Sequence, residues 1–257
     1  MTHEYFAPEG AKELLAQHGL DSFAALWALE LDAVDAPNTS RGGWSSVYRL
    51  ELADANGVSH GYYLKRQDNH LTRSLRRPFG EPTFAREFRA IKSYAAKGIP
   101  ALEAVYFGQR ALNGRRQALL LTEALDGYEP LSTWFEQWST LGWDRRQALT
   151  LAAAELVRSL HRAGKVHQCL YPKHVFISLS GSAATARLID LEKTRRAWFG
   201  RADYVADLGS FSRRSKVPQR TEKLRFILAY LQKRRLDDEA KALIGKIQKR
   251  IEAKERR

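Results

Sequence analysis

The stretch VHQCLYPKHVFI, residues 166–177, places the chain's only cysteine between two histidines and just ahead of a β-branched run. A metal site, a Cys–His nucleophile, a catalytic loop and buried packing all suit these residue types. VFISL predicts a strand, and ATARLID predicts a second strand that returns after the turn at Ser180-Gly181-Ser182. The hairpin therefore ends in Asp190, and the residues on either side must be used to choose among these possibilities.

Length and cysteine content narrow the class of protein. With 257 residues the chain can bury a substantial core, in one large domain or in two lobes. The single cysteine, Cys169, excludes an intrachain disulfide and fits a reducing compartment. No apolar run approaches the roughly 20 residues that span a bilayer, and the N-terminal residues lack a signal pattern. We therefore expect a cytoplasmic protein.

The first half of the chain predicts mostly antiparallel sheet with one main helix. Asn-Gly pairs between alternating strands are strong hairpin signals. Thr83 is the expected N-cap of the main helix, and Gly98 is its expected stop. The expected elements are short amphipathic helices over 10–18 and 22–31, hairpins turning at Asn56-Gly57 and Asn113-Gly114, a strand ending in Lys65, a polar and basic loop over 68–83, and a helix from Thr83 to Lys97.

After Leu125 the pattern becomes helical. A long helix is expected from Trp143 to Ala163, and the chain from Tyr204 onward predicts almost continuous helix. The fold class is therefore α+β, a β-rich lobe followed by a helical lobe. The expected division is a helical N-terminal extension (1–37), a first lobe (38–125), and a second lobe with a basic helical C-terminus (126–257).

Four features follow one another in the order that phosphoryl transfer requires. Backbone N–H groups can cover phosphates, a glutamate can hold a lysine, and a carboxylate can bind Mg²⁺. An aspartate at the end of an interior strand also needs a polar partner. The four features are the glycine turn Arg41-Gly42-Gly43, the strand lysine Lys65, the helix glutamate Glu87, and the histidine loop with the hairpin ending in Ile189-Asp190-Leu191-Glu192.

In this order and spacing the chain resembles the protein-kinase-like superfamily. Within it, the chain is most similar to the bacterial lipopolysaccharide kinase family, which phosphorylates Kdo or heptose of the inner core. The resemblance implies a bilobal fold, with an antiparallel β-rich N-lobe carrying one main helix and a mainly helical C-lobe, and the use of ATP and Mg²⁺. It covers roughly residues 38–215 and rests on YYLKRQ (62–67), FAREF (84–88), VHQCLYPKHVFI (166–177), LIDLEKTR (188–195) and DYVADLGSF (203–211).

The resemblance assigns nucleotide-binding roles in the first lobe. Gly42 and Gly43 would cover the phosphates of ATP with backbone N–H groups. Lys65 would bind the α- and β-phosphates, and Glu87 would hold Lys65 through a charge-assisted bond. The backbone from Glu123 to Leu125 would be the hinge that binds adenine.

The resemblance also assigns roles in the second lobe. Asp190 would be the metal-binding aspartate, in the sequence DLE. His167 would brace the catalytic loop by hydrogen bonds, and Asp207 would brace the same loop from a helix. His174 stands where kinases carry a metal-binding asparagine, so it is a second candidate metal ligand.

The opening stretch departs from the kinase pattern H-R-D-x-x-x-x-N at three positions. Gln168 replaces the arginine, which argues against control by a phosphorylated activation loop. His174 replaces the asparagine, and because imidazole is a poorer Mg²⁺ ligand than an oxygen donor, one metal held by Asp190 is expected rather than two. Cys169 replaces the catalytic aspartate, and a thiol is mostly protonated at neutral pH. His174 or an acidic residue of the substrate pocket could substitute as the base.

Two functions follow from these departures. The first is an ATP-dependent kinase that phosphorylates heptose or Kdo of the lipopolysaccharide inner core. The second is a pseudokinase-like regulatory or scaffold protein that binds nucleotide and transfers phosphate poorly or not at all. A zinc site at His167, Cys169 and His174 lacks an obvious fourth ligand, and a Cys–His hydrolase lacks an oriented triad.

The charge distribution predicts an anionic partner. The net charge is +13, and from Phe211 onward there are 16 Lys/Arg against 6 Asp/Glu. With a basic loop at Arg73, Arg76 and Arg77, this suits the lipopolysaccharide inner core or another anionic glycan. The basic C-terminus also suits peripheral contact with the inner membrane. A nucleic-acid partner is disfavoured, because residues 231–257 contain no aromatic side chain for base stacking.

Overall fold

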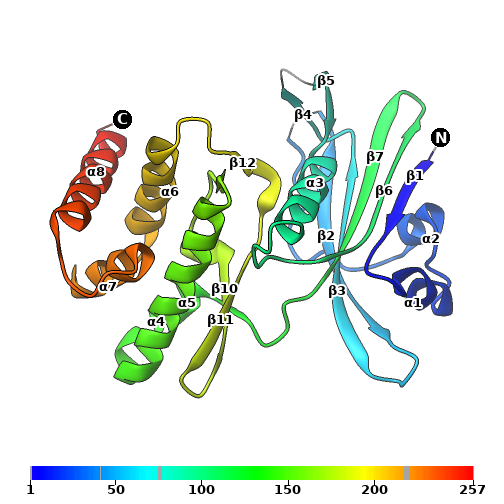
Figure 1. Cartoon of the computed structure of the whole chain (residues 1–257). Helices are drawn as coiled ribbons and strands as arrows, with labels where there is room; N and C mark the ends of the chain where they lie inside the picture. The colour runs from blue at the N-terminus through cyan, green and yellow to red at the C-terminus, as the bar shows by residue number, and fades with distance from the viewer. Residues whose placement is uncertain (1, 41, 75–76, 217–219, 257) are drawn as a thin grey trace. The chain divides into compact units, whose positions relative to one another are not determined.

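The computed structural model describes residues 2–40, 42–74, 77–216 and 220–256 (Figure 1). The chain forms two compact units. The first consists of residues 1–93 and 102–126, and the second of residues 94–101 and 127–257. Each unit buries its own set of apolar side chains.

The first unit is built on a five-stranded antiparallel sheet in the order β1-β6-β7-β3-β2. Both predicted hairpins are confirmed. At the second turn, Asn113 and Gly114 have φ of +50° and +74°, the left-handed conformation that this residue pair adopts readily. The strands are β1 (Thr2–Phe6), β2 (Trp44–Ala53), β3 (Ser59–Asp68), β6 (Ala104–Leu112) and β7 (Arg115–Glu123).

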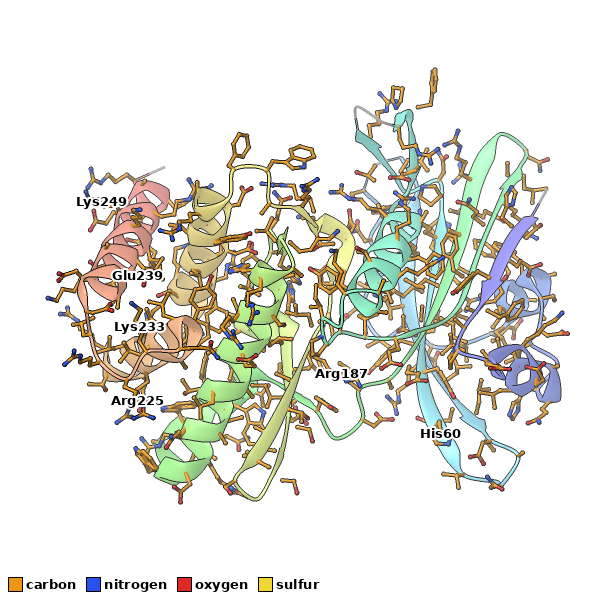
Figure 2. All side chains as sticks on the ribbon, viewed as in Figure 1. His60, Arg187, Arg225, Lys233, Glu239 and Lys249 are labelled. Atoms are coloured by element: carbon orange, nitrogen blue, oxygen red, sulfur yellow. The ribbon has the colours of Figure 1, made fainter. Side chains whose placement is uncertain are left out.

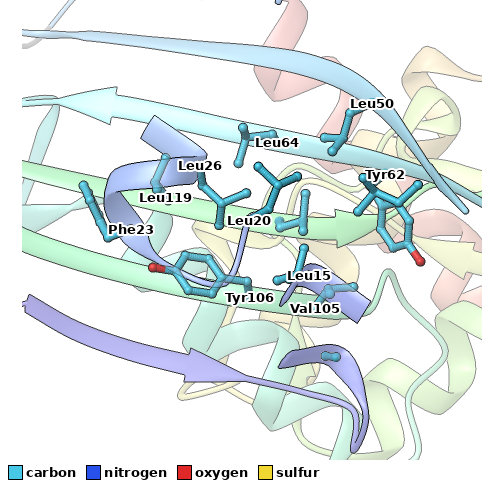
Figure 3. Close-up of a cluster of buried hydrophobic side chains, with 13 residues drawn as sticks. Leu15, Leu20, Phe23, Leu26, Leu50, Tyr62, Leu64, Val105, Tyr106 and Leu119 are labelled. Atoms are coloured by element: carbon cyan, nitrogen blue, oxygen red, sulfur yellow. The ribbon is translucent and has the colours of Figure 1, made fainter. Parts of the chain in front are cut away.

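One face of this sheet is covered by the two short helices α1 (Ala11–Gln17) and α2 (Phe23–Ala28). Figure 3 shows their apolar side chains packed against alternate residues of the strands, such as Leu64 and Tyr106. The N-terminal segment was expected to be helical, but it begins with strand β1, which pairs with β6. The strand is only five residues long and mostly exposed, so the sequence gives it no clear period.

The opposite face carries helix α3 (Thr83–Ala95), whose Phe88 ring stacks on Phe107 with centroids 4.5 Å apart. The cap of this helix differs from the prediction. The Gln67 side chain, from β3, accepts hydrogen bonds from the Thr83 hydroxyl and the Phe84 N–H, each at 2.8 Å. A strand residue therefore satisfies the helix terminus that Thr83 was expected to cap.

The segment expected to be a polar loop forms a third hairpin, β4 (Leu71–Ser74) and β5 (Arg77–Pro82). Arg73 is exposed, and Arg77 lies 4.0 Å from Glu81. Arg76 lies outside the described residues. The sequence did not signal this hairpin, because both strands are short and β5 contains two prolines and a glycine.

The second unit is mainly helical. The long predicted helix is confirmed as α5 (Trp143–Arg162), which buries Leu149, Ala153 and Leu160 at helical spacing. The other helices are α4 (Leu131–Glu136), α6 (Arg201–Arg214), α7 (Arg220–Leu231) and α8 (Asp238–Glu255). Two small sheets accompany them: β8 (Glu129–Pro130), β10 (Val175–Ser180) and β11 (Ala183–Leu188), and the pair β9 (Lys165–Val166) and β12 (Arg195–Arg196).

The C-terminal helices carry many charged side chains (Figure 2). Lys233 bonds Glu239 at 2.5 Å and also pairs with Asp237, while Lys249 on α8 is exposed. Among the described residues, no helix combines the length and apolar character needed to cross a bilayer.

Candidate active site

The predicted glycine turn joins two chain segments that run antiparallel in the first unit. Asn38 and Ser45 exchange backbone hydrogen bonds at 2.8 and 2.9 Å, and the Val34 N–H donates to the Val47 carbonyl at 2.8 Å. The segment before β2 therefore extends the sheet pairing, although only isolated bridges connect it. Arg41, at the turn itself, lies outside the described residues.

Both glycines of the turn are required by the backbone. Gly42 has a φ of +76°, which L side chains rarely adopt. At Gly43, a Cβ atom would lie 2.1 Å from the Asp68 carbonyl oxygen, so the end of β3 leaves no room for a side chain. The turn is thus held close to β3 by two positions that only glycine satisfies.

Lys65 lies inside β3, opposite Val47 of β2 and Leu120 of β7, rather than at the strand end as expected. Alternation along the strand sends Leu64 into the core with α1 and α2 and turns Lys65 toward α3. There Lys65 Nζ donates to Glu87 Oε1 at 2.6 Å, and the Glu87 side chain is only 4% exposed. The structure therefore brings these two predicted residues together as a largely buried ion pair.

The segment predicted to bind adenine begins where β7 ends. The Glu123 N–H donates to the Glu103 carbonyl at 3.0 Å, and the Ala124 N–H donates to the Gly61 carbonyl at 2.9 Å. In the described chain, the Leu125 N–H donates to no backbone carbonyl.

In the second unit, Asp207 of α6 holds the opening stretch in place. Its carboxylate, on a residue 2% exposed, accepts the His167 N–H at 2.6 Å and the Gln168 N–H at 2.9 Å. Gln168 has a φ of +66°, an uncommon conformation for a residue with a side chain. A buried carboxylate therefore fixes a strained turn at the start of the loop.

His167 connects this loop to the end of the β10–β11 hairpin. Its ring is fully buried, and Nε2 donates to the Ile189 carbonyl at 2.9 Å. Because a carbonyl can only accept, this bond places the ring proton on Nε2. The structure thus places His167 as a bridge between the loop and the residue before Asp190.

His174 and Asp190 lie next to each other. His174 Nδ1 donates to the Cys169 carbonyl at 2.8 Å, and its Nε2 lies 3.4 Å from Asp190 Oδ2. Burial lowers the pKa of His174, although Asp190 acts in the opposite direction. His174 therefore binds the loop through Nδ1 and turns Nε2 toward the Asp190 carboxylate.

Asp190 is strained and accessible. Its φ is +58°, in the left-handed region, and its side chain is 46% exposed. Such backbone conformations persist where the surrounding structure determines them and are frequent at functional sites. The sequence suggested a buried aspartate with a partner; the partner is His174, and solvent reaches the rest of the carboxylate.

These two side chains fit a magnesium ion held partly by other ligands. Mg²⁺ is commonly bound by one or two carboxylates, completed by phosphate oxygens and water. In the described chain, no three His, Cys, Asp or Glu side chains gather into a metal cluster. The zinc site considered from the sequence is therefore not formed, whereas the donors suit a nucleotide-bound Mg²⁺.

Cys169 is half-buried and contributes its carbonyl to the loop. Both nitrogens of His174 are directed elsewhere, so the Cys–His nucleophile considered from the sequence is not formed. The thiol instead lies beside Tyr171, whose pKa is raised by burial and by Cys169.

The family model of the lipopolysaccharide kinases (Kdo/WaaP) matches residues 24–230. The chain belongs to this family. The match includes every predicted site residue of both units, and it confirms the resemblance inferred from the motifs. Membership in the lipopolysaccharide kinase family supports a phosphotransferase that acts on lipopolysaccharide.

Two known proteins are similar to this chain. Protein InaA of Escherichia coli (strain K12) is 34% identical over 178 residues, covering 68% of this chain and 80% of InaA. A solved structure of WaaP in complex with acyl carrier protein matches with a TM-score of 0.68 at 22% identity, over 98% of each chain. At that identity the similarity shows the fold alone, and it confirms the α+β, bilobal protein-kinase-like fold.

This lipopolysaccharide kinase family member also contains a polar network that the sequence did not reveal. Arg195 donates to Asp203 at 2.7 and 2.9 Å. With its amide oxygen turned toward Arg195, Gln168 accepts from that guanidinium at 2.6 Å and donates to the Lys193 carbonyl at 3.0 Å. No local spacing signals these contacts, because the three side chains come from a loop, a short strand and a helix.

Proposed function

We propose that the chain is an ATP-dependent kinase that phosphorylates a hydroxyl of heptose or Kdo in the lipopolysaccharide inner core. The observation that carries this proposal is the Lys65–Glu87 ion pair at 2.6 Å, which joins the interior strand β3 to the main helix α3 of the first unit. A lysine in this setting is restrained by its partner and presents a fixed positive charge to phosphates. The family assignment supplies the acceptor class.

The remaining residues would divide the work between binding and charge stabilisation. Gly42 and Gly43 keep the turn close to β3, where its N–H groups can cover phosphates. Asp190 and His174 would hold Mg²⁺, which when bound neutralises charge on the transferred phosphoryl group. Glu123 and Leu125 would orient the purine through backbone groups.

Whether the chain is an active kinase or a pseudokinase depends on how far Cys169, in place of an aspartate, slows phosphate transfer. A protonated thiol cannot accept the acceptor's proton as a carboxylate does. The transition state of phosphoryl transfer is largely dissociative, so positioning and charge stabilisation supply most of the rate. We therefore expect slower transfer, by roughly 10²–10⁴ relative to a kinase with an aspartate base, rather than none.

The test is transfer of labelled γ-phosphate from ATP to purified inner-core lipopolysaccharide. Asp190→Asn removes the charge of the metal-binding carboxylate and is expected to abolish transfer. Glu13→Gln, at an exposed position of α1, is the matched control and should leave the rate unchanged. Equal rates for the wild type and Asp190→Asn would contradict the proposal.

The pseudokinase alternative makes a different prediction for the same protein. It predicts no transfer by the wild type, while Mg²⁺-ATP still raises the melting temperature by binding the folded state. If neither transfer nor nucleotide-dependent stabilisation is found, the assignment of Lys65 and Glu87 to nucleotide binding is wrong.

We also propose that the second unit binds an acyl chain presented by a carrier protein. WaaP was solved in complex with acyl carrier protein. In this chain, helices α4 to α8 line a cavity of about 560 Å³, within the size range of ligand pockets. Its apolar lining includes Leu149, Ala153, Leu208, Phe211, Phe226 and Ile247.

The cavity proposal is tested by filling it. Ala153→Phe is expected to reduce the affinity for acylated carrier protein about tenfold, which corresponds to about 1.4 kcal/mol. Binding of the unacylated carrier protein serves as the control and should not change. Equal affinities of the wild type for the two forms would contradict the proposal.

A further inference from the structure

Two large aromatic side chains that are adjacent in the chain lie exposed in the loop between β12 and α6. Trp198 is 69% exposed and Phe199 is 73% exposed. Single exposed apolar residues are common on protein surfaces, but an adjacent pair of this size forms a patch that usually marks an interaction site. No step of the proposed phosphate transfer uses either residue.

The loop is held in this conformation by a polar scaffold beneath it. Asp203, which is 8% exposed, accepts two bonds from Arg195 and a third from the Phe199 N–H at 3.0 Å. The Arg195 guanidinium lies 5.6 Å from the centre of the Trp198 ring. The Ala197 N–H donates to the Gly164 carbonyl at 2.8 Å. The aromatic pair is therefore displayed by a fixed structure.

Cations surround the aromatic pair. Lys193, Arg196 and Arg201 are exposed, and Arg196 lies opposite Lys165 in the β9–β12 register. In the parts of the chain that the structure describes, none of Lys165, Arg196 and Arg201 forms an ion pair with a carboxylate. Asp203, the acidic residue of this segment, is already paired with Arg195. The loop thus carries an exposed apolar pair with exposed cations, Arg196 and Arg201, on either side of it in the chain.

We propose that residues 193–201, the aromatic–basic loop, insert Trp198 and Phe199 into the interface of an anionic membrane. Tryptophan is favoured at the headgroup level, and basic residues beside it attract anionic lipids. Two such signals together give binding that neither gives alone. This inference refines the membrane partner expected from the basic C-terminus, and it does not depend on phosphate transfer.

A single-stranded nucleic acid is the competing ligand for aromatic and basic residues. Base stacking requires rings that follow a groove along the strand. Here the two rings are adjacent on one loop, and the Arg195 guanidinium already lies against the Trp198 ring. The geometry therefore favours insertion into a lipid surface over stacking with bases.

The aromatic–basic loop is connected to the candidate catalytic residues of the second unit, so membrane binding by this loop would affect where those residues lie. The loop begins three residues after Asp190, and β12 pairs with β9, which leads into the loop containing His167. The Thr194 hydroxyl donates to the Val166 carbonyl at 2.8 Å. Docking of the aromatic–basic loop would therefore place the catalytic residues of the second unit close to a membrane-embedded acceptor.

The experiment measures binding of the full chain to vesicles of phosphatidylcholine, alone or mixed with phosphatidylglycerol. The wild type should float with the mixed vesicles, and Trp198→Ser/Phe199→Ser should weaken this binding at least about tenfold. Trp143→Ser, at a residue 58% exposed on α5, is the matched control and should bind like the wild type. Equal melting temperatures would show that all three proteins are folded.

A second measurement locates the contact directly. In a Cys169→Ser background, an environment-sensitive fluorophore is attached at Phe199→Cys or, as the control, at Trp143→Cys. A blue shift with mixed vesicles at position 199 alone supports the proposal. No shift at 199 would overturn it.

Charge-reversal variants distinguish the contribution of the aromatic–basic loop to vesicle binding from that of the basic C-terminus. Arg196→Glu/Arg201→Glu should weaken vesicle binding more than Lys246→Glu/Lys249→Glu on α8. If only the α8 reversal matters, the aromatic–basic loop is not the contact, while the membrane role of the basic C-terminus stands. If the Trp198/Phe199 variant loses binding to a single-stranded oligonucleotide but keeps vesicle binding, the ligand is a nucleic acid and the proposal is wrong.

Discussion

Lys65 and Glu87 lie 22 residues apart in the chain and form an ion pair at 2.6 Å inside the first unit. Removing one partner of a buried pair leaves an uncompensated charge, which costs far more than the pair itself contributes. Substitutions of single residues are therefore most informative at two places. Changes to the Lys65–Glu87 pair test nucleotide binding, and changes to Cys169 test the phosphate-transfer step.

Glu87→Gln is expected to lower the free energy of unfolding by about 3 kcal/mol and to weaken ATP binding. The physical reason is that Lys65 keeps its charge but loses the carboxylate that restrains it. Urea unfolding and the shift of melting temperature with Mg²⁺-ATP measure the two effects. Glu13→Gln is the control, and an unchanged nucleotide shift in Glu87→Gln would contradict the assigned role.

Cys169→Asp is expected to raise the transfer rate at least about tenfold, because it supplies a carboxylate where the thiol stands. Cys169→Ser should leave the rate within about twofold, since neither a thiol nor a hydroxyl acts as the base. Steady-state phosphate transfer measures both. Loss of all activity in Cys169→Ser would instead show that the thiol has a chemical role.

At the scale of elements, the positions of loops depend on contacts with neighbouring strands. The start of α3 is fixed by the Gln67 side chain of β3, and the glycine turn is fixed by its close approach to the end of the same strand. Strand β3 thus organises three neighbouring features, because Lys65 belongs to it as well.

Gly43→Ala should destabilise the protein and weaken nucleotide binding, because the added methyl would lie 2.1 Å from the Asp68 carbonyl oxygen. The backbone of the turn must then move away from β3. Gly245→Ala is the control: it lies in helix α8 with no atom within 4 Å of the added methyl, and should stabilise by about 0.5–1 kcal/mol. Thermal unfolding measures the stability of both variants relative to the wild type. Equal stability of Gly43→Ala and the wild type would contradict the steric argument.

At the scale of the whole molecule, the net charge of +13 makes acid conditions unfavourable. Protonation of carboxylates at low pH increases the positive charge further. Carboxylates that are paired in the folded state resist protonation, so they contribute most to stability as the pH falls. Arg195 lowers the pKa of Asp203 by hydrogen bonding. A lowered folded-state pKa contributes stability above the unfolded value near 3.8, and this contribution is lost as the pH falls through the folded value.

Arg195→Met is therefore expected to reduce stability at pH 7 and to move acid unfolding to a higher pH. The difference between the variant and the wild type should disappear well below pH 3.8, where Asp203 is protonated in both. Circular dichroism across an acid titration measures the midpoints. Lys241→Met, at an exposed i,i+3 pair with Asp238, is the control and should shift the midpoint little.

Much of the fold could be predicted because its signals are local. The Asn-Gly pairs define the hairpins, and the spacing of apolar residues defines α5. The errors occurred where local signals were weak. Strands β1, β4 and β5 are short, and the α3 cap comes from a residue sixteen positions before Thr83.

The sequence by itself determined the family, the fold class and the identity of the candidate site residues, because motif order, turn pairs and hydrophobic period are properties of the linear chain. Tertiary structure alone decided how those residues are used. It paired His174 with Asp190 and turned its other nitrogen away from the Cys169 thiol, and it displayed Trp198 and Phe199 on a loop held by Asp203. The physical reason is that hydrogen-bond partners, burial and side-chain exposure depend on distances in space, which separation along the chain does not specify.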